Sequence, residues 1–137
     1  MAQRGEVSVV ILLDTCSLLW LAADQDRLSA AAKTAIGENA DRLFVSSISA
    51  FELAIKARKG KLELPMGPAI WYESALQHHG LTEVPIDGAI ASLAVNLPPL
   101  HSDPCDRFII ATALHHGMAI VTCDVLISQY KEARVVW

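Results

Sequence analysis

Short apolar, β-branched segments alternate with helical patterns along the whole chain, and this alternation constrains the fold more than any other feature. Strands separated by helices are typical of βαβ units, in which neighbouring strands run parallel. The predicted strands cover residues 7–13, 43–46, 81–86, 119–122 and 135–137. We therefore expect an α/β protein: a three-layer α/β/α sandwich with a central, mostly parallel sheet of about five strands.

End signals mark the expected helices. Asp103-Pro104 places an acidic N-cap before a proline at the first helical position, and glycines follow several of the helical patterns. The predicted helices cover residues 17–23, 29–36, 49–59, 68–79, 88–96, 104–116 and, as a shorter segment, 125–130. No linker or repeat interrupts them, so residues 1–137 are expected to form a single domain.

Composition limits the function class and the compartment. The longest apolar runs, 9–13 and 18–23, are too short to span a bilayer, and the N-terminus does not look like a signal peptide. Cys16, Cys105 and Cys123 suggest no disulfide framework, which fits a reducing cytoplasm. The net charge of −4 is unusual for a nucleic-acid binder, but it counts only weakly because basic residues bunch around 56–61.

Four acids fall where the predicted strands end. Asp14 closes the first strand, Glu52 lies in the first turn of the helix after the second strand, and Asp124 follows the fourth strand. Asp106, in the first turn of the 104–116 helix, joins them if that helix starts on the same side. Ligands of open parallel sheets bind at this edge. Converging carboxylates repel unless a cation neutralises them, and an all-oxygen site favours Mg²⁺ or Mn²⁺.

Each acid also has an ordinary structural interpretation. Ser49 and Glu52 have the spacing of a capping box. Asp106 is favoured by the dipole of its helix, Asp124 could initiate a turn, and Asp14 could cap the helix that follows it. The joint pattern of four acids at one edge is therefore more informative than any single member.

Four segments in order carry a family resemblance: 12–20 (LLDTCSLLW), 46–56 (SSISAFELAIK), 101–113 (HSDPCDRFIIATA) and 120–124 (IVTCD). In these segments the chain resembles the PIN-domain nucleases, particularly the toxin subunits of VapBC-type toxin–antitoxin pairs. The resemblance implies a PIN-like sandwich and a set of acids. Its conserved acids would be Asp14, Glu52 and Asp106, with Asp124 as a fourth, more variable one.

The same resemblance implies supporting residues. Thr15 and Thr122 look like hydroxyl residues that assist such a site, and Asp103 begins the Asp-Pro-x-Asp-Arg motif, where it would cap the helix or support the site. Cys105 departs from the family, whose members often carry an aromatic residue there. The three cysteines beside the acids are expected to be small buried hydrophobes, although inhibitory zinc binding is an alternative.

The resemblance implies a divalent-metal-dependent endoribonuclease. Water would attack the scissile phosphate in line and leave a 5′-phosphate and a 3′-hydroxyl, with Mg²⁺ or Mn²⁺ as cofactor. Candidate phosphate contacts are the basic residues Lys56, Arg58, Lys59, Lys61 and Arg107. For the cluster at 56–61, the alternative is a solvated helix end in which Glu52 and Lys56 form an ordinary ion pair.

The expected biological role is the toxin of a type II toxin–antitoxin system in the cytoplasm. Such a toxin would act on RNA, form a homodimer and be silenced by a cognate antitoxin protein. Two alternatives remain open: a PIN-fold module that binds RNA or protein without turnover, and an RNA-processing nuclease outside a toxin–antitoxin pair.

Overall fold

A computed structural model describes residues 9–137 and places five strands in one sheet. The strands are β1 (Ile11–Leu13), β2 (Leu43–Ser46), β3 (Thr82–Val84), β4 (Ala119–Val121) and β5 (Arg134–Val136). Their order is β3-β2-β1-β4-β5, and every neighbouring pair is parallel. This confirms the predicted parallel sheet of about five strands. Residues 7 and 8 of the first predicted strand lie outside the described residues.

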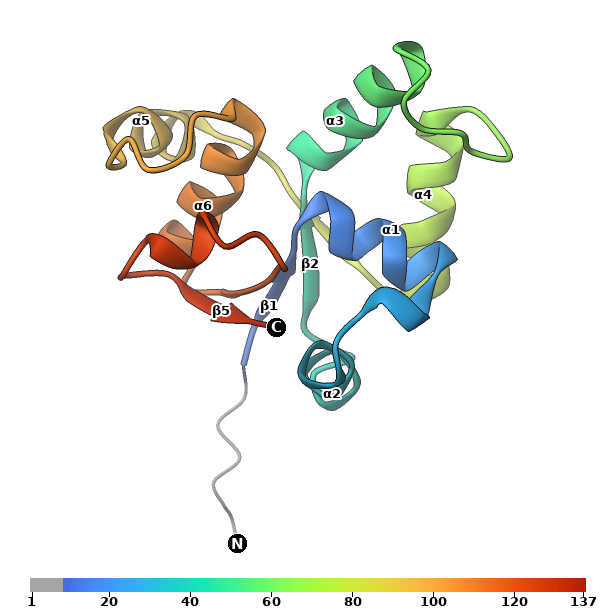
Figure 1. The fold of residues 1–137 in the computed structure, drawn as a ribbon, viewed down its shortest axis with the longest axis horizontal. Helices are drawn as coiled ribbons and strands as arrows, with labels where there is room; N and C mark the ends of the chain where they lie inside the picture. The colour runs from blue at the N-terminus through green and yellow to red at the C-terminus, as the bar shows by residue number, and fades with distance from the viewer. Residues whose placement is uncertain (1–8) are drawn as a thin grey trace, which may run out of the picture.

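Helices cover both faces of the sheet (Figure 1). They are α1 (Thr15–Ala23), α2 (Ala30–Glu38), α3 (Ser47–Arg58), α4 (Pro68–His79), α5 (Gly88–Asn96) and α6 (Pro104–His116), with short 3₁₀ turns η1 (Gln25–Arg27) and η2 (Ile127–Gln129). Within residues 9–137, no helix is long and apolar enough to cross a membrane.

Helices α4, α5 and α6 have the predicted ends because their caps are local. The Asp87 carboxylate accepts a hydrogen bond from the Ile90 amide at 2.9 Å, and Asp103 caps α6 in the same way. Gly80 and Gly117 end α4 and α6 in the left-handed conformation, with φ of 66° and 69°. A glycine adopts this conformation without the steric cost of a Cβ atom.

Helices α1 and α3 begin earlier than predicted, because each starts directly at the end of a strand. Asp14 caps α1, and Ser46, the last residue of β2, caps α3 through a hydrogen bond from the Ile48 amide at 3.1 Å. The prediction that Ser49 opens α3 is therefore wrong. Helix α2 was predicted to end at residue 36, before Gly37, but it continues to Glu38.

Strand β1 lies at the centre of the sheet and divides the core into two layers. Ile11 and Leu13 pack with α1, α2, α3 and α4, whereas Leu12 packs with α5 and α6. All three side chains are fully buried. A strand covered on both faces needs apolar residues at every position, which explains why the run before Asp14 has no polar alternation.

The chain reverses its direction of travel across the sheet between β1 and β4. It passes from β1 to β2 to β3 on one side and then returns to place β4 on the other side of β1. Leu13 is in register with both Val45 and Val121, so β1, β2 and β4 end at the same level. Such a switch point leaves a crevice at the carboxyl ends of the strands, where ligands of α/β proteins bind.

Candidate functional site

Asp14 lies at the switch point, directly after β1, and its carboxylate is only 5% exposed. One oxygen accepts a hydrogen bond from the Ser17 amide at 2.8 Å and so caps α1. The other accepts a hydrogen bond from the Thr122 hydroxyl, which follows β4. The capping interpretation is therefore correct, but it does not account for the second contact, which joins the ends of β1 and β4.

Glu52 faces the same edge from the second turn of α3. Its Oε1 accepts a hydrogen bond from the Thr15 hydroxyl at 2.6 Å, and its Oε2 lies 3.2 Å from Lys56 Nζ. The buried Ser49 hydroxyl lies 2.9 Å from Thr15 Oγ1 and completes a small polar cluster. Glu52 therefore forms no capping box with Ser49, because Ser49 is already inside the helix.

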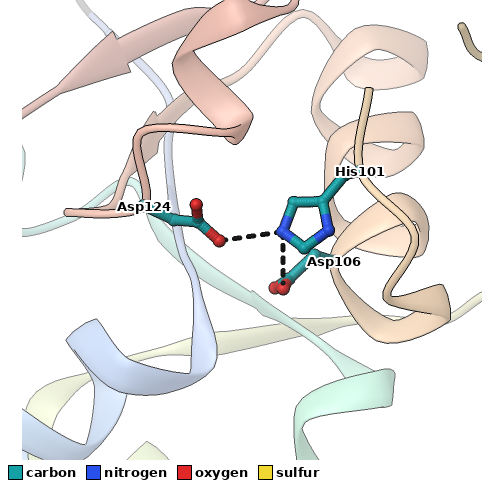
Figure 2. Close-up of side chains that lie close together, drawn as sticks. All are labelled: His101, Asp106 and Asp124. Carbon is teal, nitrogen blue, oxygen red and sulfur yellow. Dashed lines mark hydrogen bonds and ion pairs between the residues drawn. The ribbon is translucent and has the colours of Figure 1, made fainter. Parts of the chain in front are cut away.

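His101 joins Asp106 and Asp124, as Figure 2 shows. Its Nε2 lies 2.9 Å from Asp124 Oδ2 and 3.1 Å from Asp106 Oδ2. One ligand-type atom from each of the three side chains lies within 4.8 Å of the others. The 104–116 helix therefore starts on the side that the acidic site requires.

The backbone fixes the tautomer of His101. The Asp103 amide donates a hydrogen bond to Nδ1 at 3.2 Å, so Nδ1 holds a lone pair and the ring proton of the neutral imidazole is on Nε2. That N–H is shared between the carboxylates of Asp106 and Asp124. Since Nε2 has no free lone pair, the two carboxylates are the groups of this trio that can ligate a cation.

Thr122 connects the two halves of the acidic cluster. Its hydroxyl donates to Asp14 and accepts a hydrogen bond from the Asp124 amide at 3.0 Å. Asp14 and Glu52 do not belong to the tight trio around His101, but each acid is close enough to influence another electrostatically. Glu52 disfavours the charged forms of both Asp14 and Asp106.

Burial and neighbouring acids disfavour the charged forms of Asp14 and Asp106. Burial, together with Asp103, Glu52 and Asp124, raises the pKa of Asp106 to about 7, while His101 opposes the shift. Burial also raises the pKa of Asp14, against the hydrogen bonds from Thr122 and Ser17. A cluster of charge-disfavoured carboxylates is the environment that a divalent cation relieves, so the residues fit an oxygen-coordinated metal.

The raised pKa of Asp106 predicts a pH-dependent stability. An unfolded chain releases this proton near pH 3.8 and the folded chain near pH 7, so rising pH between these values favours unfolding. We expect the melting temperature in EDTA to fall across this range, with a smaller decline in Asp106→Asn. Thermal unfolding at a series of pH values tests this, with Asp26→Asn as an exposed control. Identical pH profiles for wild type and Asp106→Asn would contradict it.

Comparison with known proteins identifies the family. The PIN domain family matches residues 11–133, nearly the whole described chain. The chain belongs to the PIN domain family. It is 39% identical over 127 residues to "Ribonuclease VapC22" of Mycobacterium tuberculosis (strain ATCC 25618 / H37Rv). The alignment covers 92% of this chain and 95% of that relative. The resemblance seen in the four sequence segments is thereby confirmed.

Solved structures share the PIN-domain architecture at low identity. DNA-bound VapBC from Salmonella typhimurium matches with a TM-score of 0.67 and 17% identity, covering 93% of this chain and 96% of that one. VapBC2 from Rickettsia felis, bound to a promoter DNA fragment, matches with a TM-score of 0.64 and 15% identity, covering 91% of this chain and 96% of that one. At these identities the match supports the PIN-like three-layer sandwich.

Sequence reasoning missed His101 as a site residue of this PIN domain. The residue lies in an irregular segment between Pro98-Pro99 and the Asp103 cap, so no strand or helix pattern predicts its direction. The available sequence signal was position: His101 is a titratable residue two positions before the Asp-Pro-x-Asp-Arg motif. In the structure it is only 7% exposed. The Tyr130 hydroxyl fixes the backbone of this segment, since it accepts a hydrogen bond from the His101 amide at 2.9 Å.

Arg107 has a structural role that its sequence position did not reveal. Its guanidinium donates hydrogen bonds to the carbonyl oxygens of Ala94, Leu97, Pro98 and His101, at 2.8, 2.9, 3.1 and 3.0 Å. These contacts bind the end of α5 and the following loop to α6. Because the guanidinium donates to these backbone carbonyls, we do not propose Arg107 as a phosphate contact.

The cysteines behave as neutral thiols. Burial raises the pKa of Cys16 and of Cys105 to about 11, and it also raises the pKa of Cys123. A raised pKa disfavours the thiolate, which is the form of cysteine that ligates zinc. Within residues 9–137, the only compact group of potential metal ligands is the His101 trio, which contains no cysteine. Cys16 and Cys105 are only partly buried and Cys123 is exposed, so the expectation of small buried hydrophobes is wrong for Cys123.

Proposed function

We propose that this PIN domain is a divalent-metal-dependent endoribonuclease and the toxin of a type II toxin–antitoxin pair. The observation that carries the proposal is the convergence of Asp14, Glu52, Asp106 and Asp124 at the switch point of the sheet. The 39% identity to a protein named as a ribonuclease supports RNA as the substrate. A carboxylate cluster of this kind is suited to phosphodiester hydrolysis with a bound cation.

Asp14, Asp106 and Asp124 are the proposed ligands of Mg²⁺ or Mn²⁺, either directly or through water. When bound, the cation supplies charge stabilisation at the scissile phosphate and lowers the pKa of the attacking water. Carboxylate oxygens suit both ions. The Nε2 of His101 that faces them carries the ring proton, and the Nδ1 lone pair accepts the Asp103 amide, so neither ring nitrogen is free for a softer metal. Asp103 supports the site indirectly, because its amide fixes that tautomer.

The remaining polar residues orient the ligands and the water. His101 holds the Asp106 and Asp124 carboxylates side by side through its shared Nε2–H. Thr122 fixes Asp14 from the opposite side, and Thr15 fixes Glu52. Glu52, held at both oxygens, is placed either to ligate or to orient the attacking water. In-line attack would expel the 3′ oxygen and leave a 5′-phosphate and a 3′-hydroxyl.

The proposed partners follow from the relatives. Structural neighbours from Salmonella typhimurium and Rickettsia felis are VapBC complexes, so we propose a cognate antitoxin that covers the acidic site, and a homodimer of this chain. The three free cysteines suit a reducing cytoplasm. Among the exposed basic residues, Arg58, Lys59 and Lys61 are available for phosphate contacts, and Lys56 can contribute beside Glu52.

Cleavage of RNA by the purified protein tests the proposal. Wild type is expected to convert total cellular RNA into discrete fragments with Mg²⁺ or Mn²⁺ and to do nothing in EDTA. The fragments should carry 5′-phosphates. These are detected because such ends ligate directly to an adaptor without kinase treatment. RNA binding without cleavage under all ionic conditions would instead support a binding module. Cleavage without any antitoxin gene beside this one would support an RNA-processing role.

A further inference from the structure

A hollow of about 240 Å³ borders the acidic cluster on the side of α3. Glu52 is one of its lining residues, so it is continuous with the proposed cleavage site. Its other walls come from α3, from the turn after α3 and from the start of α6. The lining residues besides Glu52 are Phe51, Ile55, Lys56, Lys59, Lys61, Asp103 and Cys105. Nothing in the acid chemistry accounts for this combination of an aromatic ring with lysines.

Phe51 is the unusual member of this wall. It directly precedes Glu52 and is 57% exposed, although a phenylalanine is ordinarily stabilised by burial. Residues four apart lie on one face of a helix, so Phe51, Ile55 and Lys59 form a row about 12 Å long. The ring and the ammonium group therefore belong to one continuous surface that leads away from the acids.

The lysines supply positive charge at the far end of this row. Lys59 and Lys61 are exposed, and within residues 9–137 neither forms an ion pair. Lys56 lies nearer the acids and pairs with Glu52. Arg58 is exposed as well but does not line the hollow. Two unneutralised cations beside an exposed ring distinguish this wall from an ordinary solvated helix end.

We infer that this hollow binds a nucleotide of single-stranded RNA beside the scissile phosphate, with its base stacked on Phe51 and a neighbouring phosphate at Lys59 and Lys61. Aromatic rings next to cations are how proteins bind single strands, because an unpaired base has a free face for stacking. In a duplex that face is covered by neighbouring bases. The inference rests on the proposed ribonuclease function and adds to it a subsite that positions one nucleotide of the RNA.

Binding of labelled RNA tests this subsite. Fluorescence anisotropy would measure the binding of a single-stranded oligonucleotide of mixed sequence to the Asp14→Asn variant. This variant is used because it should not cleave the RNA during the measurement. Adding Phe51→Ala is expected to weaken binding about 10-fold. Adding Lys59→Gln and Lys61→Gln, which removes the contact to one phosphate, should reduce the slope of log affinity against log salt by about 0.7. A duplex of the same sequence should bind more weakly and should not respond to Phe51→Ala.

Matched variants separate the subsite from general effects. Ile70→Ala removes a similarly exposed apolar side chain on α4, and Lys33→Gln removes an exposed lysine charge on α2, outside the hollow. Neither variant should change RNA binding. Circular dichroism should show that all variants fold. Unchanged affinity in Phe51→Ala, equal duplex binding, or no RNA binding at all would overturn the subsite. Cleavage by wild type is measured separately, so failure of the nuclease and failure of the subsite are distinguishable.

Discussion

Asp14→Asn is expected to abolish RNA cleavage while leaving the fold intact. The asparagine oxygen can still accept the Ser17 amide at the start of α1, so the helix cap is retained. What disappears is the negative charge at the point where β1 and β4 meet. We expect activity to fall about 1000-fold, which corresponds to about 4 kcal/mol of lost transition-state stabilisation. Cleavage of a defined RNA by purified wild type and variant measures the effect.

Two further measurements make the Asp14 result interpretable. Asp87→Asn is the matched control, because Asp87 is also an N-cap after a strand, and within residues 9–137 no hydrogen bond joins it to the four acids. It should cleave like wild type. Calorimetric titration with Mn²⁺ should show weakened binding to Asp14→Asn alone. If Asp14→Asn cleaves as fast as wild type, either the activity belongs to a contaminant or Asp14 is not needed for catalysis.

Arg107→Ala is expected to cause the largest loss of stability among the site-adjacent substitutions. Removing the guanidinium takes a donor from the carbonyls of Ala94, Leu97 and His101, whereas the Pro98 carbonyl keeps the Tyr130 hydroxyl and the Leu100 amide. We expect a loss of about 3 kcal/mol, because three partly buried acceptors lose a hydrogen bond to a charged donor. For a domain of this size the melting temperature should fall by about 10 °C. Thermal and urea unfolding both measure the loss.

The Arg107 prediction also has a readout at the acids. The loop that Arg107 holds carries His101, so its loosening should weaken Mn²⁺ binding as well as stability. Arg107→Lys keeps the charge but replaces the planar fork by one ammonium group, and it should be nearly as destabilising. Arg58→Ala, which removes an exposed guanidinium from the end of α3, should change neither property. A stable Arg107→Ala with normal Mn²⁺ affinity would show that the loop is held by other contacts.

The sequence by itself determined the secondary structure wherever the signal is local. Asp87 and Asp103 cap helices with their own side chains, and Gly80 and Gly117 end them through backbone conformation, so α4, α5 and α6 have the predicted ends. The central strands β1 and β4 follow equally well, because a strand buried on both faces must be apolar throughout. Three of the acids were placed at one edge by this pattern alone, since parallel strands end on the same side.

The tertiary structure decided what depends on contacts between distant segments. Whether Ser46 or Ser49 opens α3 is settled by the direct passage from β2 into the helix, and Ser49 is used instead to contact Thr15 from another element. His101 meets Asp124 only because the loop after α5 is tied down by Arg107 and Tyr130. Caps and periodicity are encoded within a few neighbouring residues, whereas these side chains take their direction from partners far along the chain.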